Sequence, residues 1–491
     1  MKVLFAASEA HPLVKTGGLG DVAGSLPIAL KKLRQDTRLV LPAYPQALEN
    51  LSNAKTVAKF KIKGSPDPVT IIEGNLANSS VKVYLVQCDP FFNRPGNPYT
   101  AADGQAWPDN AARFTLFSRA LVEIAQNRAG LNWQPEIVHC HDWQTGLVPA
   151  LLALEDERPA TLFTIHNLAY TGSFSWLSFR ALELPYELWS MHGLEFHGSF
   201  SCLKGGLAFS DHVNTVSPSY AREICTPEFG QGFEHLLQYR AKSLSGILNG
   251  VDYDIWNPES DALLDTHFSA SRLAGKKKNK AQLQSHFGLE QNPKIPLIGH
   301  IGRLVHQKGA DLILDILPDL VKADIQFVLL GSGDGWMEEA INDAAKQYPG
   351  KVAAHIGYNE KLAHQIEAGS DIFLMPSRFE PCGLNQIYSL RYGTVPVVRR
   401  TGGLADTVID CMPHTLDARI ANGFIFDDPS SWALHSSLER ALEVFPKQKQ
   451  WKRLIEAGMA QDFSWKNSAR QYLDLYKRLL KQEPYRVSLK G

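Results

Sequence analysis

The chain has 491 residues, of which 21% are charged and 44% are apolar, and its formal net charge is -1. This length exceeds what one hydrophobic core usually organises, which predicts two domains, and the near-zero charge excludes a general electrostatic attraction to nucleic acid or to an anionic membrane. The six cysteines include no CxxC pair, so we expect reduced thiols. No apolar run approaches the roughly 18 residues that span a bilayer, and the opening MKVLFAAS is too short for a signal sequence. We therefore expect a cytoplasmic protein.

Short apolar runs alternate with helix-period segments along the chain, a pattern typical of parallel sheets covered by helices. In the first half, strands are predicted at residues 2–7, 37–41, 81–87, 136–139, 160–165 and 212–216. Val22, Leu26, Leu30 and Leu33 line one face of a predicted helix between the first two strands. The pattern therefore predicts a doubly wound, Rossmann-like α/β domain over residues 1–244.

A second series of strands begins after a polar stretch. The run 245–252 starts it, and further strands are predicted at 295–301, 325–330, 371–375 and 395–398. A second Rossmann-like domain is therefore expected over 245–460. The basic run 276–278 is interpreted as a solvated face. Two such domains would face a cleft, and ligands of doubly wound folds bind at the carboxyl ends of the strands, so the chemistry is expected on loops that follow strands.

The first such loop is glycine-rich. Lys15, Thr16, Gly17, Gly18 and Asp21 lie between the first strand and the first helix. Backbone amides and the helix dipole at this turn could hold a phosphate, and the alternative is a tight turn with only a structural role. The lysine favours the phosphate.

Two later strands of the first half end in polar side chains. The sequence His139-Cys140-His141-Asp142-Trp143 could bind a metal, form a sugar-binding edge or be buried. The sugar-binding edge is favoured because an indole packs on the apolar face of a pyranose. His166 and Asn167 follow the strand at 160–165, where they are either site residues or satisfied core residues. Their position on a loop favours the site.

In the second half, the strand at 295–301 delivers Arg303 and then Lys308 on one loop. Two cations there could clamp a pyrophosphate, and the alternative is a pair of solvated charges. Glu380, Cys382, Gly383 and Leu384 follow the strand at 371–375, at the start of a helix, and a second turn, Arg400-Thr401-Gly402-Gly403, follows the next strand. Together these turns outline an anion pocket.

An Asp-x-Asp sequence at 252–254 is a weak metal signal. Cations and helix dipoles can neutralise a departing diphosphate by themselves, so no metal and no cofactor are expected.

The motifs are more specific together than singly. KTGGLGDV, HCHDWQTG, FTIHNLAYTG, LNGVD, GRLVHQKG, SRFEPCGLNQ and RRTGGLADTV occur in this order, and in this the chain resembles the bacterial glycogen synthase and plant starch synthase family over nearly its whole length. The resemblance implies a GT-B fold with a final helix, within 461–491, that crosses back to the first domain. It also implies retaining transfer of glucose from ADP-glucose to the non-reducing 4-hydroxyl end of an α-1,4-glucan.

The resemblance further implies residue roles. Lys15, Gly17 and Gly18 would lie at the donor phosphates and sugar, Arg303 and Lys308 at the diphosphate, and Tyr358 on the adenine, with Asp142, His166, Asn249, Glu380 and Cys382 around the glucose. Catalytic roles are assigned to Glu380, His166, Asp142, Arg303 and Lys308. The remaining substrate-binding candidates are Thr16, Asp21, Tyr99, Trp143, Asn167, Gly383, Leu384, Thr401, Gly402 and Gly403.

Two other functions remain open from the sequence. One is a non-catalytic glucan-binding protein, which would tolerate loss of Glu380 or of the cationic pair, although all three residues are present. The other is a phosphorylase that uses pyridoxal phosphate, for which no lysine motif is evident. The mechanism also stays open between attack from the face of the departing group and a double displacement, for which Asp142 is the only candidate nucleophile.

Overall fold

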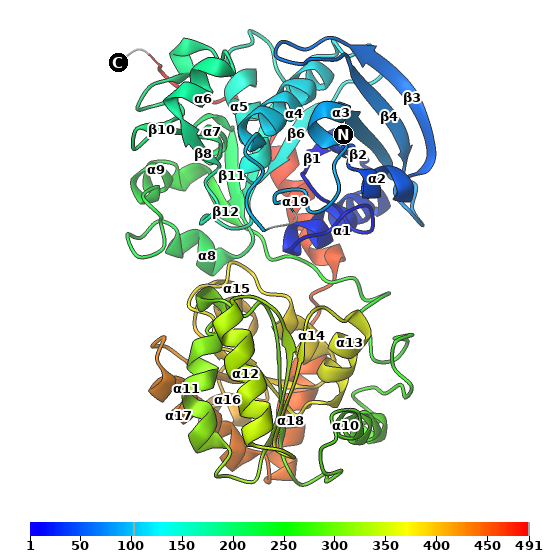
Figure 1. Ribbon diagram of the computed structural model, residues 1–491, viewed down its shortest axis with the longest axis vertical. Coiled ribbons are helices and arrows are strands. Elements are labelled where there is room, and N and C mark those ends of the chain that lie inside the picture. The colour runs from blue at the N-terminus through cyan, green and yellow to red at the C-terminus, as the bar shows by residue number, and fades with distance from the viewer. Residues whose placement is uncertain (102–103, 490–491) are drawn as a thin grey trace. The chain divides into compact units, whose positions relative to one another are not determined.

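The computed structural model describes residues 1–101 and 104–489. The chain divides into two compact units, Met1–Gly250 with Trp465–Gly491, and Val251–Ser464. Each is an α/β unit built on a mainly parallel sheet, as the alternation of apolar runs predicted (Figure 1). The run 245–252 is predicted to open the second domain, but its first residues belong to the strand Leu244–Gly246, which pairs in parallel with the strand His212–Thr215 at the edge of the first sheet.

The first sheet has nine strands. In spatial order they are β12 (Leu244–Gly246), β11 (His212–Thr215), β7 (Ala160–Ile165), β6 (Ile137–His141), β1 (Lys2–Ala6), β2 (Asp36–Pro42), β5 (Lys82–Gln87), β4 (Val69–Asn75) and β3 (Ser52–Phe60). Strands β12 to β5 are parallel, whereas β4 and β3 add to the edge in antiparallel fashion. A separate small sheet contains β8 (Ser173–Ser175), β10 (Ser199–Ser201) and β9 (Glu195–Phe196).

Helices of the first unit cover this sheet. They are α1 (Gly18–Lys32), α2 (Pro45–Asn50), α3 (Asp89–Phe92), α4 (Asn110–Ala125), α5 (Leu147–Leu152), α6 (Trp176–Ala181), α7 (Cys202–Phe209), α8 (Pro218–Glu223), α9 (Glu234–Tyr239) and α19 (Trp465–Leu479), with short 3₁₀ turns η1 (Trp143–Thr145), η2 (Tyr186–Leu188) and η3 (Ala241–Ser243). Helix α1 packs beside α19, and α4 packs against α5 (Figure 1). Val22, Leu26 and Leu30 are fully buried, so the predicted apolar face of α1 does face the core.

The second sheet has six parallel strands in the order β15 (Val352–Ile356), β14 (Gln326–Gly331), β13 (Leu297–Ile301), β16 (Ile372–Met375), β17 (Val395–Arg399) and β18 (Phe424–Phe426). Its helices are α10 (Ala274–His286), α11 (Ala310–Leu320), α12 (Gly335–Gln347), α13 (Glu360–Gly369), α14 (Asn385–Arg391), α15 (Gly402–Thr407), α16 (Pro413–Asp417), α17 (Ser431–Val444) and α18 (Gln448–Met459), with the 3₁₀ turn η4 (His306–Lys308). Helix α10 packs against α13, and α11 packs against α17.

One prediction about α10 is wrong. Lys276, the first residue of the basic run, is buried and donates hydrogen bonds to Thr394 Oγ1 at 2.7 Å and to Ala368 O at 3.1 Å, while Lys277 and Lys278 are exposed. Burial lowers the pKa of Lys276 to about 7. A run of like residues on a helix faces different directions because successive side chains are about 100° apart, so a basic run need not be one solvated face.

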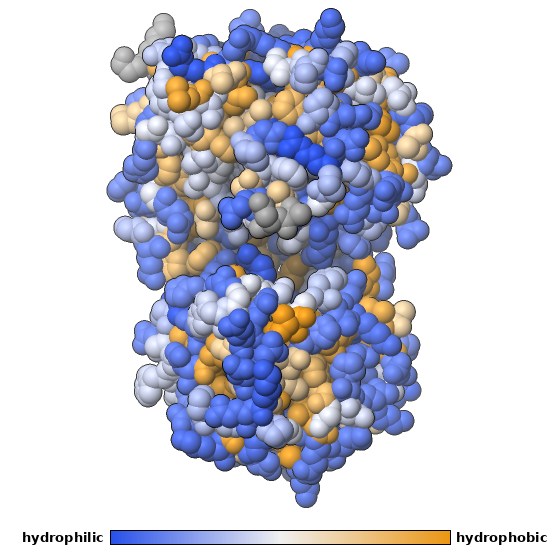
Figure 2. All heavy atoms as spheres, in the orientation of Figure 1, coloured by the Kyte–Doolittle hydropathy of each residue, from blue (hydrophilic) through white to orange (hydrophobic). Residues whose placement is uncertain are grey.

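The face seen in Figure 2 is largely polar, with apolar side chains scattered over it. No helix among the described residues is both long enough and apolar enough to cross a membrane.

Candidate active site

In the first unit, β1 lies between β2 on one side and β6 on the other, so the direction in which strands are added reverses at β1. Such a reversal is where doubly wound sheets bind ligands, at the carboxyl ends of the strands. The loops after β1, β6 and β7 carry the glycine-rich turn, Asp142 and His166 respectively. The topology therefore brings these three predicted segments to one edge of the sheet.

The glycine-rich turn is held by a carboxylate that the sequence analysis did not single out. Glu9, 3% exposed, accepts hydrogen bonds from the backbone amides of Thr16 and of Gly17, the latter at 3.3 Å. Lys15 Nζ forms an ion pair with Asp21 Oδ1 at 2.7 Å, and Gly17 is the N-cap of α1. Two amides considered as phosphate donors thus bind Glu9 in this structure. No local pattern marks Glu9, because its partners lie seven and eight positions along the chain.

Burial dominates the acid chemistry at this edge. It raises the pKa of Glu9 to about 7, although the two amide hydrogen bonds oppose the shift. It also raises the pKa of Asp142 to about 7, with amide hydrogen bonds from His166 and Asn167 opposing and the negative charge of Glu9 adding to the rise. Two carboxyl groups with raised pKa values at the carboxyl ends of neighbouring strands are typical of a functional site.

Asp142 adopts an unusual backbone conformation. Its φ of 55° and ψ of -178° lie in a region that non-glycine residues rarely occupy, and such strain costs about 1–3 kcal/mol and clusters at functional sites. The Asp142 carboxylate accepts a hydrogen bond from the His166 amide at 2.7 Å. This bond ties the loop after β6 to the end of β7.

Further predicted residues of the first unit lie around this edge. His166 Nε2 is 2.9 Å from His141 Nδ1, and burial lowers the pKa of His166 to about 3, so the imidazole is neutral at physiological pH. The Tyr99 hydroxyl is hydrogen bonded to Ser8 Oγ at 2.7 Å, just after β1, and Asn167 Oδ1 accepts the Ala169 amide at 3.0 Å. The side-chain oxygen of Asn249 is buried and accepts no hydrogen bond within the described part of the chain.

The remaining members of the His-Cys-His-Asp-Trp sequence have structural contacts. His139 is fully buried, and its two ring nitrogens are hydrogen bonded to Tyr476 OH at 2.8 Å and Thr164 Oγ1 at 2.7 Å. Trp143 is half-buried, with its ring 4.9 Å from that of Phe114 and 5.8 Å from that of Phe174. Within residues 1–101 and 104–489, no group of three or more His, Cys, Asp or Glu side chains is arranged to hold a metal ion.

In the second unit, β13 lies between β14 and β16, so this sheet has its own reversal at β13. The loop after β13 contacts the loop after β16 closely. Gly309 has φ of 70°, and a Cβ there would lie 2.2 Å from Pro376 O. The Arg378 amide donates to Gln307 O at 2.8 Å. Only glycine allows this approach, which sets the distance between the predicted cationic loop and the loop that carries Glu380.

Lys308 and Glu380, predicted from separate motifs, form an ion pair. Lys308 Nζ lies 2.5 Å from Glu380 Oε2, and Ser377 Oγ donates to the same oxygen at 3.0 Å. Glu380 is 5% exposed. Arg303, on the same loop as Lys308, is exposed, and its Nη2 lies 3.4 Å from Gln307 Oε1. The structure therefore brings both predicted cations and the predicted carboxylate to the carboxyl ends of β13 and β16.

The two glycine turns of the predicted anion pocket also meet. Gly402 begins α15, with Thr401 as its N-cap, and the Gly403 amide donates to Glu380 O at 3.1 Å. A Cβ on Gly402 would lie 2.0 Å from Glu380 O, and one on Gly403 would lie 2.0 Å from Cys382 O. Cys382 is buried, Gly383 has φ of 71°, and Leu384 is the N-cap of α14. The starts of α14 and α15 thus lie side by side.

Tyr358 follows β15, which is separated from β13 by β14. Its side chain is 79% exposed, so its ring face can receive a flat ligand.

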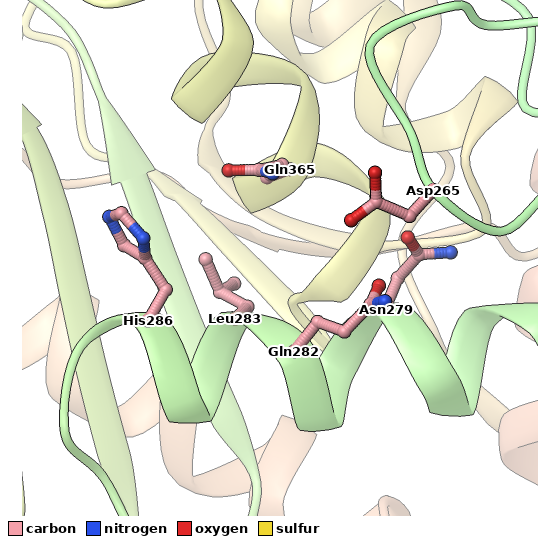
Figure 3. A pocket seen from close by; sticks show the side chains of 6 residues that line it. All are labelled: Asp265, Asn279, Gln282, Leu283, His286 and Gln365. Carbon is pink, nitrogen blue, oxygen red and sulfur yellow. The ribbon is translucent and has the colours of Figure 1, made fainter.

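One cavity lies away from the predicted site residues, and another is lined by chain neighbours of two of them. The cavity in Figure 3 has a volume of about 20 Å³ and is lined by Asp265, Asn279, Gln282, Leu283, His286 and Gln365. It contains no predicted site residue and has room for about one water molecule. A cavity of about 260 Å³ in the first unit is lined in part by Val14, Asn97 and Pro98, which are chain neighbours of Lys15 and Tyr99.

Known proteins match both units of the chain. The family model described as Starch synthase catalytic domain matches residues 2–239, and the one described as Glycosyl transferases group 1 matches residues 282–458. The glycogen synthase of Thioalkalivibrio sulfidiphilus (strain HL-EbGR7) is 55% identical over 482 residues, covering 98% of this chain and 100% of that protein. The glycogen synthase of Cellvibrio japonicus (strain Ueda107) is 53% identical, covering 97% and 99%.

Solved structures extend the comparison to the fold. The catalytic domain of starch synthase IV from Arabidopsis thaliana, bound to ADP and acarbose, is 34% identical with a TM-score of 0.88, over 98% of this chain and 99% of that one. Sucrose-phosphate synthase from Thermosynechococcus elongatus, 15% identical with a TM-score of 0.61, shares the fold. The predicted fold class, two parallel-sheet α/β domains of the GT-B type, is confirmed, and the chain belongs to the glycogen synthase and starch synthase family of glycosyltransferases.

Proposed function

We propose that this chain is a glycogen synthase that transfers glucose from ADP-glucose to the non-reducing 4-hydroxyl end of an α-1,4-glucan with retention of configuration. The observation that carries the proposal is the group formed by Arg303, Lys308 and Glu380 where the second sheet reverses. The named relatives and the ADP-bound starch synthase support the same assignment. Nucleic acid and membrane are not among the proposed partners, and we propose the cytoplasm as the place of action.

The second unit binds the donor in this proposal. Arg303 and Lys308 neutralise the diphosphate, and the helix starts near Cys382 and Thr401 face the same anion. Lys308 would exchange part of its interaction with Glu380 for the phosphate. Charge that is already in place when the leaving group departs is usually the largest catalytic contribution, and one such donor is worth on the order of 3 kcal/mol. Tyr358 stacks on the adenine.

The first unit holds the sugar and the acceptor. In this proposal Asp142, His166 and Asn249 bind the glucose hydroxyl groups, and a glucose-binding role is also proposed for Glu380. The bond between C1 and the diphosphate oxygen breaks, and its electron pair leaves with the diphosphate. The acceptor 4-hydroxyl then attacks C1 from the same face and passes its proton to the departing phosphate oxygen, so the α configuration is retained.

A double displacement through Asp142 is less well supported by the geometry. The Asp142 carboxylate is already bound to the His166 amide at 2.7 Å, and its pKa near 7 leaves it partly protonated at neutral pH. Both features weaken a carboxylate nucleophile. Trapping of a glucosyl group on Asp142 would reverse this preference.

The decisive experiment offers labelled ADP-glucose and UDP-glucose separately to the purified protein with glycogen as acceptor. We expect label from ADP-glucose to enter glycogen in bonds that α-amylase releases, with much less transfer from UDP-glucose. Absence of transfer from ADP-glucose, or transfer into bonds resistant to α-amylase, would refute the proposal. Heat-inactivated protein provides the baseline.

A further inference from the structure

A pair of neutral histidines lies directly behind the predicted sugar-binding edge. His141, the last residue of β6, is fully buried, and its Nδ1 is 2.9 Å from Nε2 of His166. The other ring nitrogen of His166, Nδ1, takes part in no hydrogen bond with the described residues, and His166 is only half-buried. His166 therefore has one nitrogen bound to His141 and one available to a ligand.

The His141 ring cannot turn away from this contact. Phe5 on β1 lies with its ring centroid 4.1 Å from that of His141 at an interplanar angle of 30°, and the ring of His139 lies 4.0 Å away at 39°. A half-turn of the ring about its Cβ–Cγ bond would place a carbon atom against His166 Nε2 and lose the hydrogen bond. Packing therefore fixes the plane of the ring, and the hydrogen bond fixes which edge of the ring faces His166.

Each ring carries one proton. Burial lowers the pKa of His141 well below its ordinary value and that of His166 to about 3, so both are neutral near pH 7. In a neutral imidazole one nitrogen donates and the other accepts, so either His141 Nδ1 donates to His166 Nε2 or the reverse holds. The two choices place the His166 proton on different nitrogens.

The second nitrogen of His141 decides between them. Nε2 of His141 is buried and has no hydrogen-bond partner in the part of the chain that the structure describes. If His166 donated, His141 would carry its proton on Nε2, which would bury an N–H group without an acceptor. Such orphaned donors are rarer in proteins than unsatisfied acceptors, and each costs about 1–3 kcal/mol. The proton of His141 therefore belongs on Nδ1.

We propose that His141 is a positioning residue that fixes the tautomer of His166: His141 Nδ1–H donates to His166 Nε2, so that His166 carries its proton on Nδ1 and offers it as a donor to a hydroxyl group of the bound sugar. The donor role toward the sugar rests on the proposed function, whereas the tautomer does not. The hydrogen bond from the His166 backbone amide to the Asp142 carboxylate holds the backbone of His166. The backbone and the ring of this residue are therefore both held before substrate binds.

The tautomer can be read directly. Long-range ¹H–¹⁵N correlation spectra of the full-length protein labelled with ¹⁵N-histidine report which ring nitrogen carries the proton, and His166→Asn and His141→Asn variants identify the two signals by their loss. We expect His166 to be protonated on Nδ1 and its signals to stay constant between about pH 6 and pH 8. A His166 signal protonated on Nε2, or one that titrates in this range, would overturn the proposal.

Kinetics test the positioning role. His141→Asn keeps an N–H donor close to the position of Nδ1, whereas His141→Leu removes it, so we expect kcat to fall about 10- to 100-fold in the leucine variant and to recover most of that loss in the asparagine variant. KM for ADP-glucose should change less than kcat. His212→Leu is the matched control, because it removes a half-buried histidine of strand β11, the neighbour of β7, and this histidine is bound to Ser245 and not to His166.

Different results would refute the positioning role of His141 and the proposed function. Folded His141→Leu protein with the kcat of the unaltered enzyme, or folded His141→Asn protein as slow as the leucine variant, would overturn the positioning role while transfer from ADP-glucose persists. A protein inactive with every nucleotide glucose but with His166 protonated on Nδ1 would refute the proposed function and support the tautomer assignment.

Discussion

The Lys308–Glu380 ion pair joins a side chain that is 22% exposed to one that is 7% exposed. Removing the lysine leaves a buried carboxylate with only Ser377 as its hydrogen-bond donor among the side chains described. Lys308→Ala should therefore lower stability as well as activity. Arg303 is exposed, and its Nη2 lies 3.4 Å from Gln307 Oε1 at the surface.

We predict that Arg303→Ala and Lys308→Ala each lower turnover with ADP-glucose by about 100-fold, because each removes one preorganised cation from the leaving diphosphate. Initial rates at saturating donor measure this effect, and thermal denaturation of the same samples measures folding. Arg303→Ala should keep the melting temperature, and Lys308→Ala/Glu380→Gln should recover the melting temperature lost in Lys308→Ala without recovering the rate. An unchanged rate in Arg303→Ala would remove this residue from the diphosphate site.

Glu9 provides a prediction about pH. Burial raises its pKa from the ordinary value of 4.5 to about 7, so between these values the folded protein binds a proton that the unfolded chain has released. The resulting stabilisation is fully present below pH 4.5 and is lost as the pH rises through 7. A shift of this size corresponds to about 3 kcal/mol.

Glu9→Gln should therefore lose less stability than the unaltered protein when the pH is raised from about 5 to about 8. Urea unfolding at both pH values, followed by tryptophan fluorescence, measures the difference. Glu367, whose pKa burial raises to about 8, contributes with the same sign in both proteins and cancels in the comparison. The negative charge of Glu9 helps to raise the pKa of Asp142, so its removal lessens the pH dependence that Asp142 contributes and changes the comparison in the same direction. Equal pH dependence of the two proteins would contradict the raised pKa of Glu9.

Among the elements of the second unit, the group formed by Lys308 and Glu380 depends on loops that approach each other more closely than a side chain permits. Gly402 has φ of 45°, and its missing Cβ leaves room for Glu380 O. Gly309 plays the same role against Pro376 O. The positions of Glu380 and Lys308 thus depend on backbone contacts between β13, β16 and β17 loops, and not on the side chains alone.

We predict that Gly402→Ala lowers kcat by about 10-fold or more, because a Cβ 2.0 Å from Glu380 O must push the two loops apart and a displacement of about 1 Å is enough to impair catalysis. Gly335→Ala is the control, since nothing lies within 4 Å of a Cβ at that position on α12. The control should have the activity and melting temperature of the unaltered protein. Full activity in Gly402→Ala would show that the loops tolerate this separation.

The whole first unit depends on the end of the chain. Helix α19 contributes Trp465, Tyr472, Leu475, Tyr476 and Leu479 to the core of the first unit. The Tyr476 hydroxyl is hydrogen bonded to His139, and the Tyr472 hydroxyl accepts a hydrogen bond from Asn214 at 3.1 Å. Burying each large apolar side chain stabilises a fold by about 1.5–3 kcal/mol, so α19 accounts for an amount comparable to the total stability of a domain.

Truncation after Ser464 should therefore unfold the first unit while the second, Val251–Ser464, keeps its own core. Amide hydrogen exchange followed by mass spectrometry measures both: protection should be lost in β1, β6 and β7 and retained in β13, β14 and β16. Tyr476→Phe is the control, because it removes one hydrogen bond worth about 1 kcal/mol and keeps the ring. Retained protection of β6 in the truncated chain would contradict the prediction.

Most buried parallel strands could be predicted from the sequence, because each is a continuous apolar run that needs no information about its neighbours. The strands β3 and β4 could not. The nine residues of β3 are mostly exposed and polar, and they form a strand only because β4 supplies hydrogen bonds at the sheet edge. The run 245–252 is expected in the second domain, yet it contributes to β12 of the first sheet, because three strand residues do not identify the sheet that they join.

The sequence by itself determined the two-domain α/β architecture, the family and the loops that carry Lys15, Asp142, His166, Arg303, Lys308 and Glu380, because strand periodicity, glycine turns and motif order are local properties of the chain. Only the tertiary structure decided that Glu9 binds the glycine-rich turn, that Lys276 is buried, and that His141 lies against His166. The Glu9 contacts fold one loop back on itself, whereas the contacts of Lys276 and His141 join separate elements. In each case the geometry depends on how segments that are not adjacent in the sequence pack together, which no local pattern contains.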